Sequence, residues 1–183
     1  IGARPAAFQT VRFSEKILQK TGITVVPVDL SEIIFRAQAL EDNDAAVQEK
    51  LSAIQGYGTI PDTIPSENVL KQAKLSVVID RWMEENECDA SAVECWDSIQ
   101  KNYGCATCLS MSMMGERNMP SACEVDVLGA VSMYALLLAS GNPPGFLDWN
   151  NNYGDDRDRC INVHCSNYPK SFIGKDEIEI SNL

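Results

Sequence analysis

Positive charge is scarce in this chain. The 183 residues include 15 lysines and arginines against 26 aspartates and glutamates, so the net charge is −11 at neutral pH. A surplus of negative charge favours solubility, and it disfavours binding to the phosphate backbone of nucleic acids or to an anionic membrane surface. We therefore expect neither nucleic acid nor a membrane as a partner.

The chain also lacks an apolar run long enough to cross a bilayer. Residues 127–139 are almost wholly apolar, but this stretch is interrupted by Gly129 and Ser132 and is shorter than the roughly 20 residues that a membrane-spanning helix needs. It predicts a helix buried in the core instead.

No signal-peptide pattern appears at the N-terminus. The seven cysteines are an odd number in a chain too large to need disulfides for stability. We expect reduced thiols, most of them small buried side chains, and hence a cytoplasmic protein.

Both ends of the chain resemble the interior of a longer protein. It begins without an initiator methionine, at a residue that reads like the end of a strand, and residues 175–180 alternate polar and apolar as a new strand would. With 45% hydrophobic residues the chain can bury a core of its own. We expect one α/β domain over residues 1–170, and the start of a following C-terminal domain or a linker over residues 171–183.

Helical and strand patterns alternate along the first half of the chain. The predicted elements are a helix over 5–20, a strand over 23–28, a helix over 29–54 with a break near 41–44, a loop over 56–65, a helix over 66–87 and a strand over 90–95. Helix followed by strand, twice over, is typical of a mostly parallel sheet flanked by helices. The predicted fold class is therefore α/β, a Rossmann-like layered domain.

Two carboxylates and the only histidine of the chain predict a metal site. Glu124 stands at the front of the apolar helix, Asp148 follows a loop rich in glycine and proline, and His164 comes after it. Carboxylate and imidazole ligands favour Mn²⁺ or Mg²⁺ over a softer thiolate metal. Ligands of parallel α/β sheets bind beyond the carboxyl ends of the strands. We place Trp96, Asp148 and His164 near such ends, where they would share one crevice.

Each of these residues has a structural alternative. Glu124 and Asp126 would also be stabilising as acids beside the positive end of a helix dipole. His164 also has a half-buried structural role as its alternative. Trp96 would either pack against the apolar face of a sugar or belong to the core.

The cysteines and a charged stretch leave two further alternatives. Cys105 and Cys108 have the spacing of a redox or zinc motif, with Cys160 and Cys165 as conceivable partners. Residues 155–159 mix both signs of charge and predict a solvated loop, with a lid as the alternative.

Several motifs taken together resemble one enzyme family. They are the phrase Pro120-Ser121-Ala122-Cys123-Glu124-Val125-Asp126 and the apolar helix after it, Cys95-Trp96 upstream, Phe146-Leu147-Asp148 downstream, and the opening Ile1-Gly2-Ala3-Arg4-Pro5-Ala6-Ala7-Phe8. The set resembles the L-fucose isomerase and L-arabinose isomerase family, in particular its shorter bacterial fucose-isomerase-like members. The resemblance covers nearly the whole chain, but only the central part of such an enzyme.

This resemblance implies a metal-dependent aldose–ketose isomerase that uses Mn²⁺ and passes through a cis-enediol. Glu124 matches the first metal-binding glutamate of the family and Asp148 the second carboxylate, and the pair would act as base and acid. His164 matches less closely, because some members supply the metal-binding histidine from a C-terminal domain. A small aldose or ketose is the implied substrate, and the full-length protein is expected to be a homo-oligomer.

The residues alone leave the class of function open between alternatives. A non-catalytic sugar-binding or oligomerisation module would fit a piece of a larger protein, and a thiol or zinc protein using Cys105 and Cys108 is a lesser alternative. Which sugar is processed is not determined by these motifs.

Overall fold

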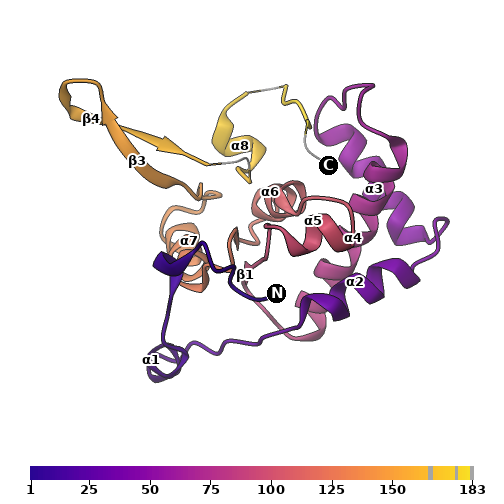
Figure 1. The fold of residues 1–183 in the computed structure, drawn as a ribbon, viewed down its shortest axis with the longest axis horizontal. Helices are drawn as coiled ribbons and strands as arrows, with labels where there is room; N and C mark the ends of the chain where they lie inside the picture. Colours follow the sequence, from indigo (N-terminus) through magenta and orange to yellow (C-terminus); the bar gives the residue numbers. More distant parts are fainter. Residues whose placement is uncertain (165–166, 176, 182–183) are drawn as a thin grey trace.

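The computed structural model describes residues 1–164, 167–175 and 177–181 (Figure 1). In chain order its elements are η1 Gln9–Val11, α1 Glu15–Lys20, α2 Leu30–Ala39, α3 Ala45–Tyr57, α4 Ser66–Glu85, β1 Ser91–Ala92, α5 Ser98–Asn102, α6 Cys108–Glu116, β2 Ser121–Ala122, α7 Val127–Ser140, β3 Asp148–Tyr153, β4 Asp156–Val163 and α8 Lys170–Ile173. Helices surround a short parallel sheet, so the predicted α/β class is confirmed. The predicted division at residue 170 stays a prediction.

The parallel sheet is built from β1 and β2. Ser91 lies opposite Ser121, and their hydroxyls form a buried hydrogen bond of 2.7 Å. The ladder continues past the assigned strands, because Val93 N–H donates to the carbonyl of Ala122 at 2.8 Å. The strand predicted over 90–95 is therefore present, with a shorter regular core than expected.

Ile1 lies beside β1 as a further extended segment. Its amino group donates to the Ala92 carbonyl at 2.8 Å, and Glu94 N–H donates to the Ile1 carbonyl at 2.9 Å. Gly2 N–H in turn donates to the Val28 carbonyl. The hydrogen-bonded layer thus runs from Val28 through Ile1 and β1 to β2.

Helices cover both faces of this layer. Ala92 and Ala122 belong to a small cluster with α7, whereas Val93 and Cys123 belong to the main core with α2 and α4. Successive side chains of a strand point to opposite faces. Small residues therefore let α7 approach one face, and larger ones fill the core behind the other.

The long helix α4 forms the centre of the main core. It packs against both α2 and α3, and the apolar stripe predicted from its sequence is buried. The predicted break between α2 and α3 is confirmed: Asp29 caps α2 through Ser31 N–H, and Asp44 caps α3 through Ala46 N–H. Aspartate at these positions satisfies backbone donors that the helix leaves unpaired.

Two predictions for the N-terminal segment were wrong. The helix expected over 5–20 is reduced to the turn η1 and the short α1, in which only Leu18 is buried and Ile17 is exposed. The strand expected over 23–28 is absent, since only Val28 takes part in the ladder. Apolar and β-branched residues favour a helix or strand only where a packing partner or a paired strand is available, and this segment has little of either.

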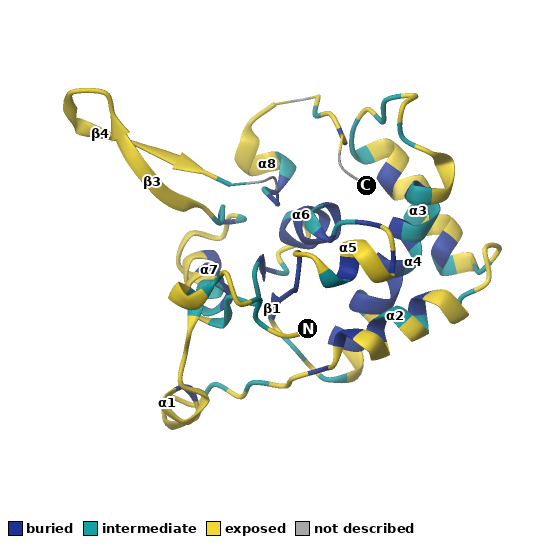
Figure 2. Ribbon diagram, in the orientation of Figure 1, coloured by how far each residue is buried: buried dark blue, intermediate teal, exposed yellow. Residues whose placement is uncertain are grey.

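The apolar segment 127–139 is a helix, but the prediction that it is buried was wrong. Three side chains of α7 are buried: Ala130, Met133 and Leu137. Three leucines are exposed: Leu128 (44%), Leu136 (56%) and Leu138 (69%). The narrow sheet covers one side of the helix only (Figure 2). No helix within the described residues combines the length and the apolar character needed to span a bilayer.

An antiparallel hairpin, β3 and β4, stands where the sequence predicted a solvated loop at 155–159. All of its strand residues are exposed, and it projects from the body of the molecule (Figures 1 and 2). The chain reverses at Gly154, whose φ of 57° is readily accepted by glycine. The alternating charges of β4 fit a strand that is exposed on both sides. In the sequence such a strand has the same polar pattern as a solvated loop, and so a loop was predicted.

Residues near the C-terminus pair with the loop before α4. Thr59 N–H donates to the Ile178 carbonyl, and Ile180 N–H donates to the Thr59 carbonyl, both at 2.8 Å. Ile180 is buried in the cluster between α3 and α4. The strand predicted over 175–180 is thus represented by one isolated bridge at Glu179, with residue 176 outside the described residues.

Candidate metal centre

Three segments of the chain bring Glu124, Asp148 and His164 together. Glu124 lies in the turn between β2 and α7, Asp148 is the first residue of β3, and His164 follows β4. One potential ligand atom from each lies within 4.8 Å of the other two. Within the described part of the chain this is the one group of three or more histidine, cysteine or acidic side chains with such spacing.

The hairpin register explains how Asp148 and His164 meet. Asp148 is paired with Val163 across the hairpin, so the next residue, His164, lies beside it. The expectation that Asp148 ends a strand was wrong, because it begins one. Glu124 does follow the carboxyl end of β2, and Trp96 lies beyond that of β1, the edge at which ligands of parallel sheets bind.

The turn that carries Glu124 is conformationally unusual. Glu124 and the following Val125 both have positive φ, 64° and 56°. Positive φ is uncommon outside glycine and exceptional for a β-branched residue, and costs on the order of 1–3 kcal/mol per residue. Hydrogen bonds from Val125 N–H to Val93 and from Asp126 N–H to Cys123 hold this turn in place. Such strain is typical of functional sites.

Asp126 has the structural role that the sequence offered as an alternative. Its carboxylate accepts a hydrogen bond of 2.8 Å from Gly129 N–H and caps α7. Glu124, two residues earlier, lies outside the helix and near Asp148 and His164. The turn therefore separates a capping acid from a potential ligand.

The three side chains suit a hard divalent cation. In a six-coordinate site with bonds of about 2.1 Å, ligand atoms lie about 3.0 to 4.2 Å from one another, which is somewhat closer than the 4.8 Å within which these atoms lie. Glu124 and His164 are half-buried and Asp148 is exposed, so the site is open to solvent and to a small ligand.

Trp96 is placed at the same edge of the sheet but is not part of the core. It is 49% exposed, and its ring meets Phe8 edge-to-face with centroids 5.2 Å apart. An exposed indole face is what a sugar-stacking role requires. That role stays a prediction.

Sequence reasoning missed the buried carboxylate of Glu94. This residue is 6% exposed, and its Oε2 accepts a hydrogen bond of 2.9 Å from Ala3 N–H. Gly2 has a φ of 85°, and a Cβ there would lie 2.5 Å from the same oxygen. Glu94 therefore fixes the loop after Ile1 against β1. A glutamate inside an otherwise apolar strand was the available signal.

The cysteine alternative finds little support. Cys105 is 3% exposed, and burial raises the pKa of its thiol to about 12, so it is a poor source of thiolate at neutral pH. Cys108 is half-buried at the start of α6, and Cys160 is exposed on β4. Cys165, the remaining conceivable partner, lies outside the described residues.

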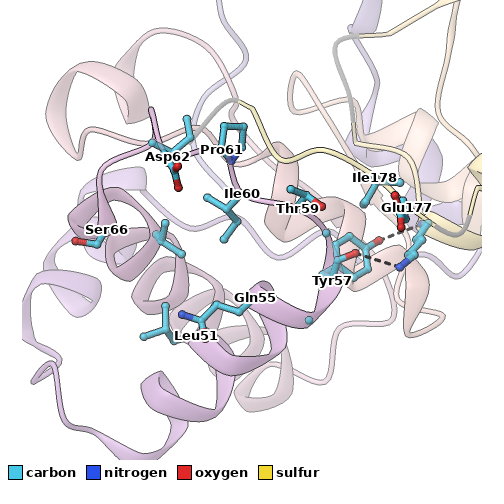
Figure 3. A pocket seen from close by; sticks show the side chains of 15 residues that line it. Leu51, Gln55, Tyr57, Thr59, Ile60, Pro61, Asp62, Ser66, Glu177 and Ile178 are labelled. Atoms are coloured by element: carbon cyan, nitrogen blue, oxygen red, sulfur yellow. Dashed lines mark hydrogen bonds between the residues drawn. The ribbon is translucent and has the colours of Figure 1, made fainter.

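A separate cleft of about 730 Å³ lies between the end of α3, the start of α4 and residues 177–178 (Figure 3). Lys170 is one of its lining residues, and it donates from its backbone N–H to the Tyr57 hydroxyl and from Nζ to the Tyr57 carbonyl. Neither Glu124, Asp148 nor His164 lines this cleft. The metal-binding geometry, rather than the size of the cavity, therefore identifies the candidate site.

Comparison with known proteins relates the chain to sugar isomerases. No family model matches it. The sulfoquinovose isomerase of Priestia aryabhattai is 29% identical over 141 residues, which is 76% of this chain and 31% of the relative. That of Clostridium sp. (strain MSTE9) is 28% identical over 149 residues, 81% of this chain and 33% of the relative. The chain thus spans about a third of the length of these relatives, and over most of its own length it is similar to sugar isomerases.

Proposed function

We propose that this chain carries the metal centre of an aldose–ketose isomerase. The observation that carries the proposal is the convergence of Glu124, Asp148 and His164 from three separate segments. Similarity to proteins named sulfoquinovose isomerase supports it independently of that geometry. Neither a sugar-binding module without catalysis nor a thiol site requires these three ligands to meet.

The chemistry of isomerisation accounts for the residue types. Moving a carbonyl from C1 to C2 of a sugar requires a proton to leave one carbon and arrive at its neighbour, by way of an enediol. Glu124 and Asp148 approach the site from different segments, so one carboxylate accepts the carbon-bound proton while the other serves the hydroxyl protons. When bound, a divalent cation polarises the carbonyl and stabilises the developing negative charge.

We assign Mn²⁺ to this site, with Mg²⁺ as the related alternative. Two carboxylates and one imidazole form a ligand set that both ions accept. Three protein ligands leave positions for two sugar oxygens in a six-coordinate site. Two neighbouring rings orient the His164 imidazole: the centroids of Phe146 and Tyr168 lie 5.3 and 6.3 Å from its own.

The substrate we propose is an aldose, and sulfoquinovose is the first candidate because the relatives bear that name. Sulfoquinovose carries a sulfonate, which the net charge of −11 disfavours unless a local cation binds it. L-Fucose and L-arabinose lack that charge and are the matched alternatives from the motif resemblance. Comparing the three sugars tests the substrate separately from the reaction.

The reaction is tested by NMR in D₂O with Mn²⁺ or Mg²⁺. We expect the protein to convert at least one of the three aldoses to its ketose and to introduce solvent deuterium at the carbon that exchanges its proton. Glu124→Gln is expected to abolish both signals. Because the chain spans about a third of its relatives, the assay uses the full-length protein; absence of conversion and of deuterium incorporation with all three sugars, when that protein binds Mn²⁺, would contradict the isomerase proposal.

We also infer that the functional protein is a homo-oligomer. Leu128, Leu136 and Leu138 of α7 and Trp149 of β3 are large apolar side chains left exposed, of the kind that interfaces cover. A two-stranded hairpin exposed on both sides is marginally stable by itself in water. Contact with a second subunit would stabilise it.

Sedimentation velocity checks this inference. We expect an oligomer that Leu136→Asp shifts toward the monomer, because a charge placed in an apolar interface loses its hydration. Ser52→Asp, on the exposed side of α3, is the matched control and should leave the distribution unchanged. A wild-type protein that is monomeric over a wide concentration range would contradict the inference.

We assign the protein to the cytoplasm. Cys88, Cys105 and Cys160 are present as thiols. Thiols persist in a reducing compartment, whereas oxidising compartments favour disulfides.

A further inference from the structure

Phe146 makes the closest aromatic contact with His164. The two ring centroids are 5.3 Å apart and the planes are inclined by 60°, an edge-to-face arrangement. The Tyr168 ring also contacts the imidazole, with centroids 6.3 Å apart and planes inclined by 78°. Edge-to-face pairs are favourable beyond the area they bury. Two such contacts restrict how the imidazole can rotate.

Phe146 is itself held in place by the first turn of α7. A Cβ on Gly129 would collide with Cε2 of Phe146, so the ring rests directly on the helix backbone. Phe146 also packs against both the main core and the cluster between α7 and the sheet. The same turn of α7 is capped by Asp126, two residues after Glu124. Phe146 thus connects the segment that carries Glu124 to the ring of His164.

Tyr168 is in turn held by a stacked aromatic contact. Tyr168 stacks on Phe172 with centroids 6.0 Å apart and planes inclined by 16°. Phe172 lies over Gly145, where a Cβ would be 2.5 Å from its ring. The aromatic residues after His164 therefore return to the loop that carries Phe146. His164 therefore contacts two rings, Phe146 and Tyr168, and each of them is packed against further residues.

We propose that Phe146 is the positioning residue of His164: it selects the side-chain rotamer in which a ring nitrogen faces Glu124 and Asp148. This rests on the proposed metal centre. A ligand held in its binding rotamer before the metal arrives loses less conformational entropy on binding. Phe146 acts through His164 and does not contact the metal.

Phe146→Leu is the test, because leucine keeps an apolar side chain and removes the aromatic edge. Residues that orient metal ligands typically contribute 10–100-fold to affinity. We expect Phe146→Leu to weaken Mn²⁺ binding by about 10-fold or more, and Phe146→Tyr to stay within about threefold of wild type because it keeps the ring. Leu147→Ala, the neighbouring exposed position, is the matched control and should not change affinity.

The only histidine of the chain makes a second readout possible by NMR without metal. Three-bond couplings that report χ1 of His164 should show one rotamer in wild type and in Phe146→Tyr, and averaging over rotamers in Phe146→Leu. A purely structural role would lower the thermal midpoint and leave χ1 unchanged. Wild-type couplings and wild-type affinity in folded Phe146→Leu would overturn the proposal. If wild type binds no Mn²⁺, the metal centre fails, and the χ1 result still decides whether Phe146 positions His164.

Discussion

Substituting glutamine for Glu124 is expected to weaken Mn²⁺ binding by at least about 100-fold. Removing a residue that only supports a ligand costs 10–100-fold, so loss of a charged ligand should cost more. Glutamine keeps the size of the side chain and removes its charge. Asp148→Asn should have the same effect, because both carboxylates lie within 4.8 Å of the other ligand atoms. Isothermal titration calorimetry at neutral pH measures both variants.

Asp126→Asn is the matched control for this prediction. It makes the same chemical change two residues from Glu124, and asparagine caps a helix as well as aspartate does. Asp126 accepts from Gly129 N–H and is not among the three converging side chains, so its variant should bind Mn²⁺ like wild type. Unchanged affinity in Glu124→Gln would mean that this acid is structural. Uptake of Zn²⁺ through thiols, with no Mn²⁺ binding, would favour the cysteine alternative.

Raising the pH above about 9 is expected to destabilise the fold through Cys105. Burial raises the pKa of this thiol from 9.0 to about 12, so the unfolded chain loses the proton at a lower pH than the folded one. The contribution of Cys105 to the free energy of unfolding is complete below pH 9, and it falls by about 1.4 kcal/mol per pH unit between pH 9 and pH 12.

Tyr103 adds to this loss at a higher pH. Burial raises the pKa of its hydroxyl above 10.0, with Cys105 nearby as a lesser cause, and the hydroxyl donates to the Lys71 carbonyl at 3.0 Å. Its contribution is complete below pH 10 and decreases above it. The two groups together make the alkaline loss of stability steeper above pH 10 than between pH 9 and pH 10.

Urea unfolding between pH 8 and pH 10.5 measures this dependence. Cys105→Ala loses some packing at every pH, but its free energy of unfolding should fall less steeply between pH 9 and pH 10 than that of wild type. Cys160→Ala, at an exposed cysteine on β4, should keep the wild-type slope. Equal slopes in wild type and Cys105→Ala would show that the buried thiol is not responsible.

Local sequence signals predicted the helices well where an apolar stripe or a capping aspartate marked them. The periodic stripe of α4 and the aspartates before α2 and α3 act over a few residues, and such short-range patterns are readable along the chain. The segment 5–20 had a comparable pattern but folds differently, because its apolar side chains depend on distant partners such as Trp96, which contacts Phe8.

The sequence predicted which residues form the candidate site, but not how the fold brings them together. Glu124, Asp148 and His164 were recognisable as carboxylates and a histidine after loops and in family-like motifs. That Asp148 and His164 meet depends on the register of the β3–β4 hairpin, whose exposed, polar strands carry no alternating apolar signal. The contacts of Phe146 with His164 and Gly129 join positions with no sequence periodicity between them.

By itself the sequence determined the α/β class, the main helices and the residue types of the candidate site, because these depend on residue type and on spacing within a few turns. Tertiary structure alone decided that α7 is covered on one side, that Asp126 caps while Glu124 turns away, and that three segments converge within 4.8 Å. These outcomes depend on contacts between residues far apart in the chain, and local propensities do not encode them.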